Sequence, residues 1–226
     1  MKARRPTSFL FDLDGTLVDS VYDHVLAWHS ALQSEGIDIS IWRIHRRIGM
    51  SGGLFTRALA RETGVEFNND VLVRLRAHHA AHYNAHSANT RPLPGARALL
   101  KYLTDTEIPW AIATSGRMVT AGPVLEILGV DATKVPVITR DVVAYAKPDP
   151  DLFLAAAEKL GIDIETACVV GDSIWDMLAA QRARALGIGF LSGGYGTDEL
   201  QRSGAYRVFD DPADMLAHID EVGGRR

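Results

Sequence analysis

Two aspartates, two positions apart, follow a short apolar run near the start of the chain. Residues 11–16 read FDLDGT, and alternate residues of a strand point to the same side. Asp12 and Asp14 can therefore converge on one ligand where the strand ends, and Gly15 permits a tight turn there. Neighbouring carboxylates repel each other unless a cation joins them, and oxygen-only ligands favour Mg²⁺. The alternative is an Asp-Gly turn with solvated carboxylates.

A second group of polar residues stands between an apolar run and a helical pattern. Thr114, Ser115 and Gly116 offer a hydroxyl and exposed backbone N–H groups, which together can bind an anion. The same residues could serve only as a helix cap.

Three more charged residues complete the candidate chemistry. Lys147 precedes a proline and supplies a positive charge for a phosphate, unless it is simply solvated. Asp172 follows the apolar residues 167–171, and Asp176 comes one helical turn later. These two carboxylates should therefore lie on the same side.

Short apolar runs alternate with longer helical patterns along most of the chain, which predicts an α/β fold with a parallel sheet. The predicted strands are 8–13, 109–114, 135–139, 167–171, 187–191 and 206–209. The predicted helices between them are 95–103, 118–128, 150–160, 174–186 and 212–219. Every candidate residue above follows a strand, and open α/β sheets bind ligands at the carboxyl ends of their strands.

One segment interrupts this alternation. About ninety-five residues separate the first two predicted strands, far more than a crossover needs. Helices are predicted at 21–35, 41–48, 53–62 and 69–86, with glycines between them. We expect an α-helical insertion that acts as a lid over the ligand edge.

Composition limits the class of protein. The chain has 226 residues, 47% of them hydrophobic, and a net charge of −4, as in globular proteins. The pI near 6.0 argues against nucleic-acid binding, and no apolar run is long enough to span a membrane. A single cysteine, Cys168, and an N-terminus unlike a signal peptide favour a cytoplasmic location.

In the order of its four motifs, the whole chain resembles the haloacid dehalogenase-like hydrolase superfamily. The resemblance implies a doubly wound core with strand order 5-4-1-2-3 and a helical cap inserted after the first motif. It divides the chain into a core domain, residues 1–18 and 91–226, and a cap domain, residues 19–90. The cap sequence looks more like phosphoglycolate phosphatases and related small-metabolite phosphatases than like the β-phosphoglucomutases of the same superfamily.

The resemblance also assigns roles. Asp12 would be the nucleophile and Asp14 the general acid and base, for which a raised pKa would be suitable. Asp12, the backbone carbonyl of Asp14, and Asp172 would hold Mg²⁺, and Asp176 would support the metal's water ligands. The remaining roles fall to the anion-binding residues: Ser115, or else Thr114, with Gly116 and Lys147 would bind the phosphoryl group.

This set of residues implies a Mg²⁺-dependent phosphatase that acts on a small phosphate ester through an aspartyl-phosphate. Dehalogenation is disfavoured because Asp14 is present. Schiff-base chemistry is disfavoured because none of the five lysines lies in the cap. A β-phosphoglucomutase is the enzymatic alternative, and a catalytically silent binding protein is the non-enzymatic one. We expect a monomer or homodimer.

Residues of the predicted cap could select the substrate. The position of His24 relative to Asp12 resembles that in the mutases, as does that of Trp28, but no arginine follows Gly49 as it does in those enzymes. Arg46 and Arg47 could bind a carboxylate or belong to a solvated helix face. Residues 49–53, which include Ser51 and Gly52, form either a specificity loop or a plain turn.

Histidines are concentrated in the same segment. His78, His82 and His86 recur every four residues, which raises the possibility of a metal site. A histidine-rich cap surface without a metal is the alternative.

Overall fold

The computed structural model describes residues 7–86 and 89–224. Its main sheet has six parallel strands in the order β5-β4-β1-β6-β7-β8. In chain order these are β1 (Ser8–Phe11), β4 (Trp110–Ala113), β5 (Val137–Ile138), β6 (Ala167–Gly171), β7 (Leu186–Phe190) and β8 (Ala205–Phe209). The predicted order of the first five strands is confirmed, and the sixth extends the sheet beyond β7.

Strand β1 lies at the centre of the sheet and is buried on both faces. Phe9 and Phe11 pack into one hydrophobic cluster, whereas Leu10 packs into a second on the opposite face. This alternation follows from the two-residue period of a strand. It is the arrangement that a doubly wound sheet requires.

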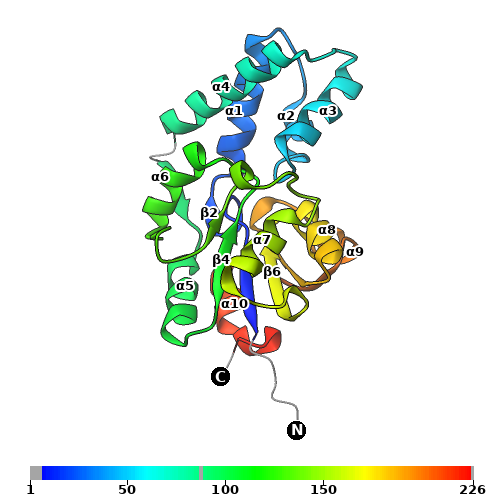
Figure 1. Ribbon diagram of the computed structural model, residues 1–226. Coiled ribbons are helices and arrows are strands. Elements are labelled where there is room, and N and C mark those ends of the chain that lie inside the picture. Colours follow the sequence, from blue (N-terminus) through cyan, green and yellow to red (C-terminus); the bar gives the residue numbers. More distant parts are fainter. Residues whose placement is uncertain (1–6, 87–88, 225–226) are drawn as a thin grey trace.

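Helices cover both faces of the sheet (Figure 1). They are α5 (Ala96–Asp105), α6 (Met118–Leu128), α7 (Asp151–Leu160), α8 (Ile174–Ala183), α9 (Thr197–Arg202) and α10 (Pro212–Ala217). The prediction that a helix continues from 174 to 186 was wrong. Helix α8 ends where Arg184 takes a left-handed conformation with φ of 61°, and Leu186 already belongs to β7. Helix α9 was not predicted because its sequence, TDELQR, buries only Leu200.

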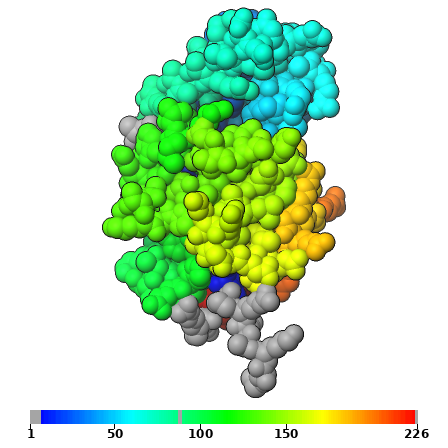
Figure 2. All heavy atoms as spheres, viewed as in Figure 1, coloured from blue at the N-terminus to red at the C-terminus, as the bar shows by residue number. Residues whose placement is uncertain are grey.

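The long segment after β1 forms four helices, as predicted. They are α1 (Val21–Ser34), α2 (Ile41–His45), α3 (Gly52–Thr63) and α4 (Asn69–His86). Their apolar side chains form a hydrophobic cluster of their own, which includes Val25, Leu32, Phe55, Leu59 and Leu75. Figure 1 shows the four helices gathered at one end of the α/β part, and Figure 2 shows their surface resting on it. No helix among the described residues is both long and apolar enough to cross a membrane.

A two-stranded antiparallel sheet joins the two ends of this helical segment. Strand β2 (Val18–Asp19) pairs with β3 (Arg91–Pro92). The sequence did not predict this pairing, because each strand has only two residues. The chain therefore enters and leaves the helical segment at one place.

Candidate active site

The candidate residues meet at the carboxyl edge of the central strands. Asp12 directly follows β1, which pairs with β4 on one side and β6 on the other. Thr114 therefore emerges beside it after β4, and Asp172 emerges beside it after β6. Strand β1 ends at Phe11 instead of Leu13, because the Leu13 carbonyl accepts hydrogen bonds from the backbone N–H groups of the following turn, 2.9 Å from the nitrogen of Leu17.

Three carboxylates form a tight group. One oxygen from each of Asp12, Asp172 and Asp176 lies within 4.8 Å of the others, and all three residues are buried. Burial raises the pKa of Asp12 to about 7, with the Lys147 charge opposing this rise and the Asp176 charge adding to it. Burial, followed by the Asp176 charge, also raises the pKa of Asp172 well above its usual range. Buried, oxygen-only donors of this kind fit a divalent cation.

Lys147 provides the positive charge opposite this group. Its side chain is fully buried, forms an ion pair with Asp12, and places Nζ 2.8 Å from Oδ1 of Asp176. Burial alone would lower the pKa of Lys147, but the two carboxylates outweigh it and raise the pKa to about 12. The ammonium group therefore stays charged inside the protein, and it is not the solvated lysine of the alternative interpretation.

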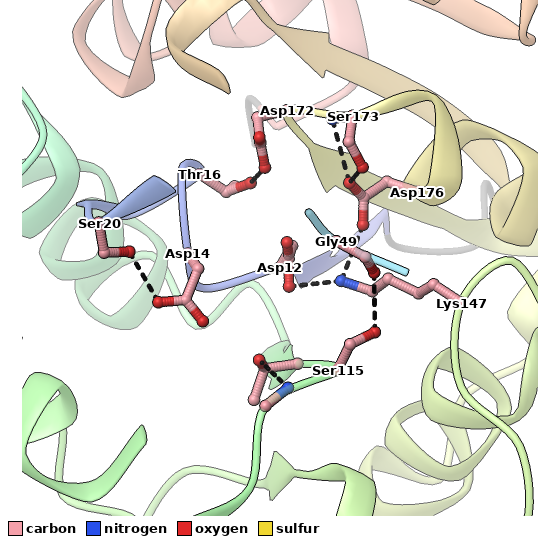
Figure 3. A network of polar contacts seen from close by, with 12 residues as sticks. Asp12, Asp14, Thr16, Ser20, Gly49, Ser115, Lys147, Asp172, Ser173 and Asp176 are labelled. Atoms are coloured by element: carbon pink, nitrogen blue, oxygen red, sulfur yellow. Dashed lines mark hydrogen bonds and ion pairs between the residues drawn. The ribbon is translucent and has the colours of Figure 1, made fainter. Parts of the chain in front are cut away.

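Asp176 is held by the start of α8. Its Oδ2 accepts hydrogen bonds from the backbone N–H of Ser173 at 3.1 Å and from the Ser173 hydroxyl at 2.5 Å. The carboxylate is thus aimed at Lys147 (Figure 3). A Cβ on Gly171 would lie 2.3 Å from the Asp176 side chain, so only glycine fits beneath this contact.

Asp172 is fixed by residues that sequence reasoning did not identify. The Thr16 hydroxyl donates a hydrogen bond of 2.9 Å to its Oδ1. A Cβ on Gly193 would lie only 1.8 Å from its Oδ2, and one on Gly15 would lie 2.6 Å away. The signal for Thr16 was its place in the first motif. Nothing near Gly193 in the sequence indicated its contact.

The side chain of Asp14 turns away from the other carboxylates toward the helical segment (Figure 3). Its Oδ1 accepts hydrogen bonds from the Ser20 hydroxyl at 2.7 Å and the Tyr83 hydroxyl at 3.4 Å, and it lies 3.1 Å from Nε2 of His24. Although burial favours a higher pKa, the His24 charge and the hydrogen bonds of His24 and Ser20 outweigh it and lower the pKa of Asp14 to about 2. The expected rise in the pKa of Asp14 was therefore wrong.

His24 belongs to a stack of rings between α1 and α4. Its Nδ1 lies 3.1 Å from Nε2 of His79, and its ring centre lies 4.0 Å from that of Tyr83. Burial lowers the pKa of His79 well below its usual range, so His79 is neutral. The sequence indicated His24 but not His79 or Tyr83, whose i, i+4 spacing on α4 was the available signal.

The residues expected to bind phosphoryl oxygens lie beside Asp12, where β4 ends. The Thr114 hydroxyl accepts a hydrogen bond of 2.9 Å from the backbone N–H of Gly116. The Ser115 hydroxyl donates one of 2.9 Å to the Gly49 carbonyl. Ser115 therefore contacts both the core site and the helical segment (Figure 3).

The glycine-containing segment 49–53 faces the core site. The backbone N–H of Ser51 donates a hydrogen bond of 2.9 Å to the Lys147 carbonyl, and Ser51 also caps α3. A Cβ on Gly49 would lie 2.8 Å from the Ser173 hydroxyl and 3.4 Å from the Trp175 ring. Trp175 thus lies under this segment.

Arg46 and Arg47, the two arginines singled out in the sequence of the helical segment, both have protein partners. Arg47 forms an ion pair with Glu62, and Arg46 forms one with Glu199 of α9. The Arg46 contact joins the helical segment to the core at a partly exposed position.

The repeated histidines do not assemble into a metal site. Nε2 of His78 lies 3.2 Å from the Ser30 hydroxyl, and Nδ1 of His86 donates to the His82 carbonyl at 2.8 Å. Within residues 7–86 and 89–224, the three aspartates above form the group that could hold a metal.

A cavity of about 210 Å³ lies between the core residues and the helical segment. Asp12, Asp14 and Ser115 line it from the core, and Trp28, Arg47 and Gly52 line it from the helices. The arrangement places the buried Asp12 carboxylate and the turn at 114–116 in the wall of a small cavity that the helical segment covers. Such a site suits a small anionic ligand.

The chain belongs to the haloacid dehalogenase-like hydrolase family, whose model matches residues 7–184. A phosphoglycolate phosphatase from Agrobacterium fabrum is 34% identical over 84% of this chain and 83% of its own. Hexitol phosphatase A from Escherichia coli is 34% identical over 75% of this chain and 76% of its own. A hydrolase from Pseudomonas syringae of known structure is 52% identical, with a TM-score of 0.92 over 96% of this chain and 99% of its own.

Proposed function

We propose that the protein is a Mg²⁺-dependent phosphatase that hydrolyses a small phosphate ester through an aspartyl-phosphate. The observation that carries this proposal is the buried cluster of Asp12, Asp172 and Asp176 with Lys147, of which Asp12 lines the covered cavity. The curated relatives named as phosphatases support it.

Asp12 is the nucleophile in this proposal. A bond forms between a carboxylate oxygen of Asp12 and phosphorus as the bond to the leaving oxygen breaks. Lys147 and the hydroxyl and N–H groups at 114–116 offset the charge on the phosphoryl oxygens. Asp12, the backbone carbonyl of Asp14, and Asp172 would hold Mg²⁺, which supplies further positive charge at the phosphoryl group.

Asp14 transfers the protons. It protonates the leaving oxygen in the first step and takes a proton from the attacking water in the second, which releases inorganic phosphate. Its pKa of about 2 describes the protein without substrate. A phosphate dianion beside a carboxylate raises the carboxyl pKa, so substrate binding favours the protonated form that the first step needs.

We further propose that residues 1–18 and 91–226 are the core domain and residues 19–90 the cap domain. The β2–β3 pair at both junctions supports these boundaries. Within the cap, His24 positions Asp14, Arg47 and Gly52 form part of the substrate wall, and Ser51 holds the 49–53 segment against the core through its backbone N–H. The substrate is a phosphorylated small metabolite, either of the phosphoglycolate type or a sugar phosphate.

Release of free phosphate from a panel of phosphate esters tests the proposal. We expect release with Mg²⁺, none with a chelator, and a loss of at least about 10³-fold in the Asp12→Asn variant. The exposed Asp131→Asn variant is the matched control and should retain activity. Interconversion of glucose phosphates without phosphate release would instead indicate a mutase, and neither activity with bound metal would indicate a silent fold.

A further inference from the structure

The helical side of the cavity offers few hydrogen-bond acceptors to the hydroxyl groups of a ligand. Trp28, Met50 and Phe55 contribute apolar and aromatic surface there. Of the described residues that 19–90 contributes to the lining, none is Asp, Glu, Asn, Gln, Ser or Thr. Sugar hydroxyls donate their hydrogens to such acceptors. A polyol leaving group would therefore exchange most of its hydrogen bonds to water for apolar contacts here, with His24 and His79 as the side chains of this wall whose ring nitrogens can accept.

Positive charge is the other property of this cavity. The arginines that line it are Arg47, Arg76, Arg117 and Arg140. Three of them already bind protein groups: Arg47 binds Glu62, Arg117 binds Asp141, and Arg140 binds backbone carbonyls. Arg76 has no ion-pair or hydrogen-bond partner among residues 7–86 and 89–224.

The position of Arg76 places this unpaired charge near the opening of the cavity. Arg76 precedes His79 by three residues on α4, so both side chains lie on one helix face. His79 is buried and stacks on Trp28, with ring centres 4.3 Å apart. Arg76 is exposed. The aromatic surface thus extends inward from Arg76 toward His24 and Asp14.

From this wall and this unpaired cation we infer that the leaving group carries a second anion, which binds Arg76. The inference rests on the proposed function and names its substrate class: phosphate esters with a short, hydroxyl-poor span and a carboxylate or second phosphate at the far end. A guanidinium binds the paired oxygens of either anion. The volume of about 210 Å³, below the roughly 300–1,000 Å³ of drug-sized pockets, limits the span to a few atoms.

A matched series of substrates tests the inference. The acids are phosphate monoesters of ω-hydroxy carboxylic acids, of which phosphoglycolate is the shortest. Each acid is compared with the ester of the same length that ends in an alcohol, and with the corresponding bisphosphate. The quantity measured is the ratio of kcat/KM for the anionic ester to that for the alcohol. Arg76→Gln removes the charge, and Arg57→Gln, an exposed arginine of α3 outside the cavity, is the control.

We expect the wild-type protein to prefer one anionic series by about tenfold or more. Arg76→Gln should lower that ratio toward one, mainly through a higher KM for the anionic ester, because a remote contact contributes equally to ground and transition states. Arg76→Lys should restore part of the ratio, and Arg57→Gln should leave it unchanged. The better anionic series identifies the second group as carboxylate or phosphate.

Two results would overturn the inference. One is equal or better hydrolysis of the alcohol esters or of sugar phosphates. The other is an anionic preference that Arg76→Gln leaves intact. Both outcomes still require Mg²⁺-dependent hydrolysis that Asp12→Asn abolishes, so they are distinct from failure of the proposed function, in which no ester is hydrolysed.

Discussion

Lys147 and Asp176 form an ion pair of 2.8 Å between two fully buried side chains. Lys147 also forms an ion pair with Asp12, so its positive charge offsets the negative charge of both carboxylates. Burying charges is costly unless they are paired. The lysine therefore links the stability of the core to the chemistry proposed for it.

Replacing Lys147 with methionine should destabilise the protein by about 3–5 kcal/mol, because it leaves buried carboxylates without their partner. Urea unfolding in the presence of a chelator measures this change without a contribution from bound metal. The exposed Lys159→Met variant is the control and should change stability by less than about 0.5 kcal/mol. A loss below about 1 kcal/mol in Lys147→Met would show that the pair does not stabilise the fold.

Gly193→Ala should weaken metal binding by about 10- to 100-fold, as changes around metal ligands commonly do. The new Cβ would lie 1.8 Å from Oδ2 of Asp172, so the carboxylate or the loop must move. Isothermal titration calorimetry with Mg²⁺ measures the affinity of each variant for the metal. Gly122→Ala is the control, because a Cβ there meets no atom within 4 Å; equal affinities in the two variants would contradict the prediction.

Cys168 should resist alkylation in the folded protein. Its side chain is buried, its Sγ lies 3.7 Å from the Val222 carbonyl, and burial raises its pKa from 9.0 to about 12. At pH 8 this lowers the thiolate fraction about 10³-fold. The pKa of Cys168 is higher in the folded protein than in the unfolded chain. The contribution of this buried neutral thiol to the free energy of unfolding is therefore fully present below pH 9 and is lost as the pH rises through about 12.

Iodoacetamide labelling at pH 8, followed by mass spectrometry, tests this prediction. The chain has one cysteine, so each labelling event reports that site. The same protein in urea is the control and should react completely. Rapid labelling of the folded protein would mean that the strand β6 opens readily.

The sequence predicted the site best where a reactive residue directly follows a strand or helix with a clear local pattern. Helix α6, helix α4 and strand β6 have their predicted bounds, and Asp12 and Asp172 lie where strand-end reasoning placed them. Each of these predictions depends on local pattern and on the rule that parallel strands present their carboxyl ends at one edge.

The sequence did not predict contacts between segments that lie far apart along the chain. Tyr83 reaches Asp14 across 69 positions, and β2 pairs with β3 through two residues each. The spacing of His79 and Tyr83 indicates that they share a face of α4, but it does not identify Asp14 as the partner of that face. Both contacts depend on how the helical segment docks. The pKa of Asp14 was mispredicted for a different reason: Ser20 and His24 are near Asp14 in the sequence, but the sequence does not show that both side chains turn toward its carboxylate.

Glu199→Gln should affect substrate binding more than stability. Glu199 forms an ion pair with Arg46, whose guanidinium carbon lies 4.1 Å from the ring centre of Tyr195. The pair joins the helical segment to the core but is partly exposed, and such pairs contribute at most about 1 kcal/mol. If the pair stabilises the docked position of the helical segment over the cavity, losing this contribution weakens substrate binding there. KM would then rise by up to about fivefold.

Steady-state kinetics at low and high salt measure this effect, because salt screens an exposed pair. The wild-type and Glu199→Gln proteins should differ in KM at low ionic strength and converge at high ionic strength. Glu165→Gln is the control, since Glu165 forms an exposed ion pair with Arg184 that lies wholly within the α/β part. If Glu199→Gln changes KM no more than Glu165→Gln does, the Arg46–Glu199 contact plays no part in holding the helical segment over the site.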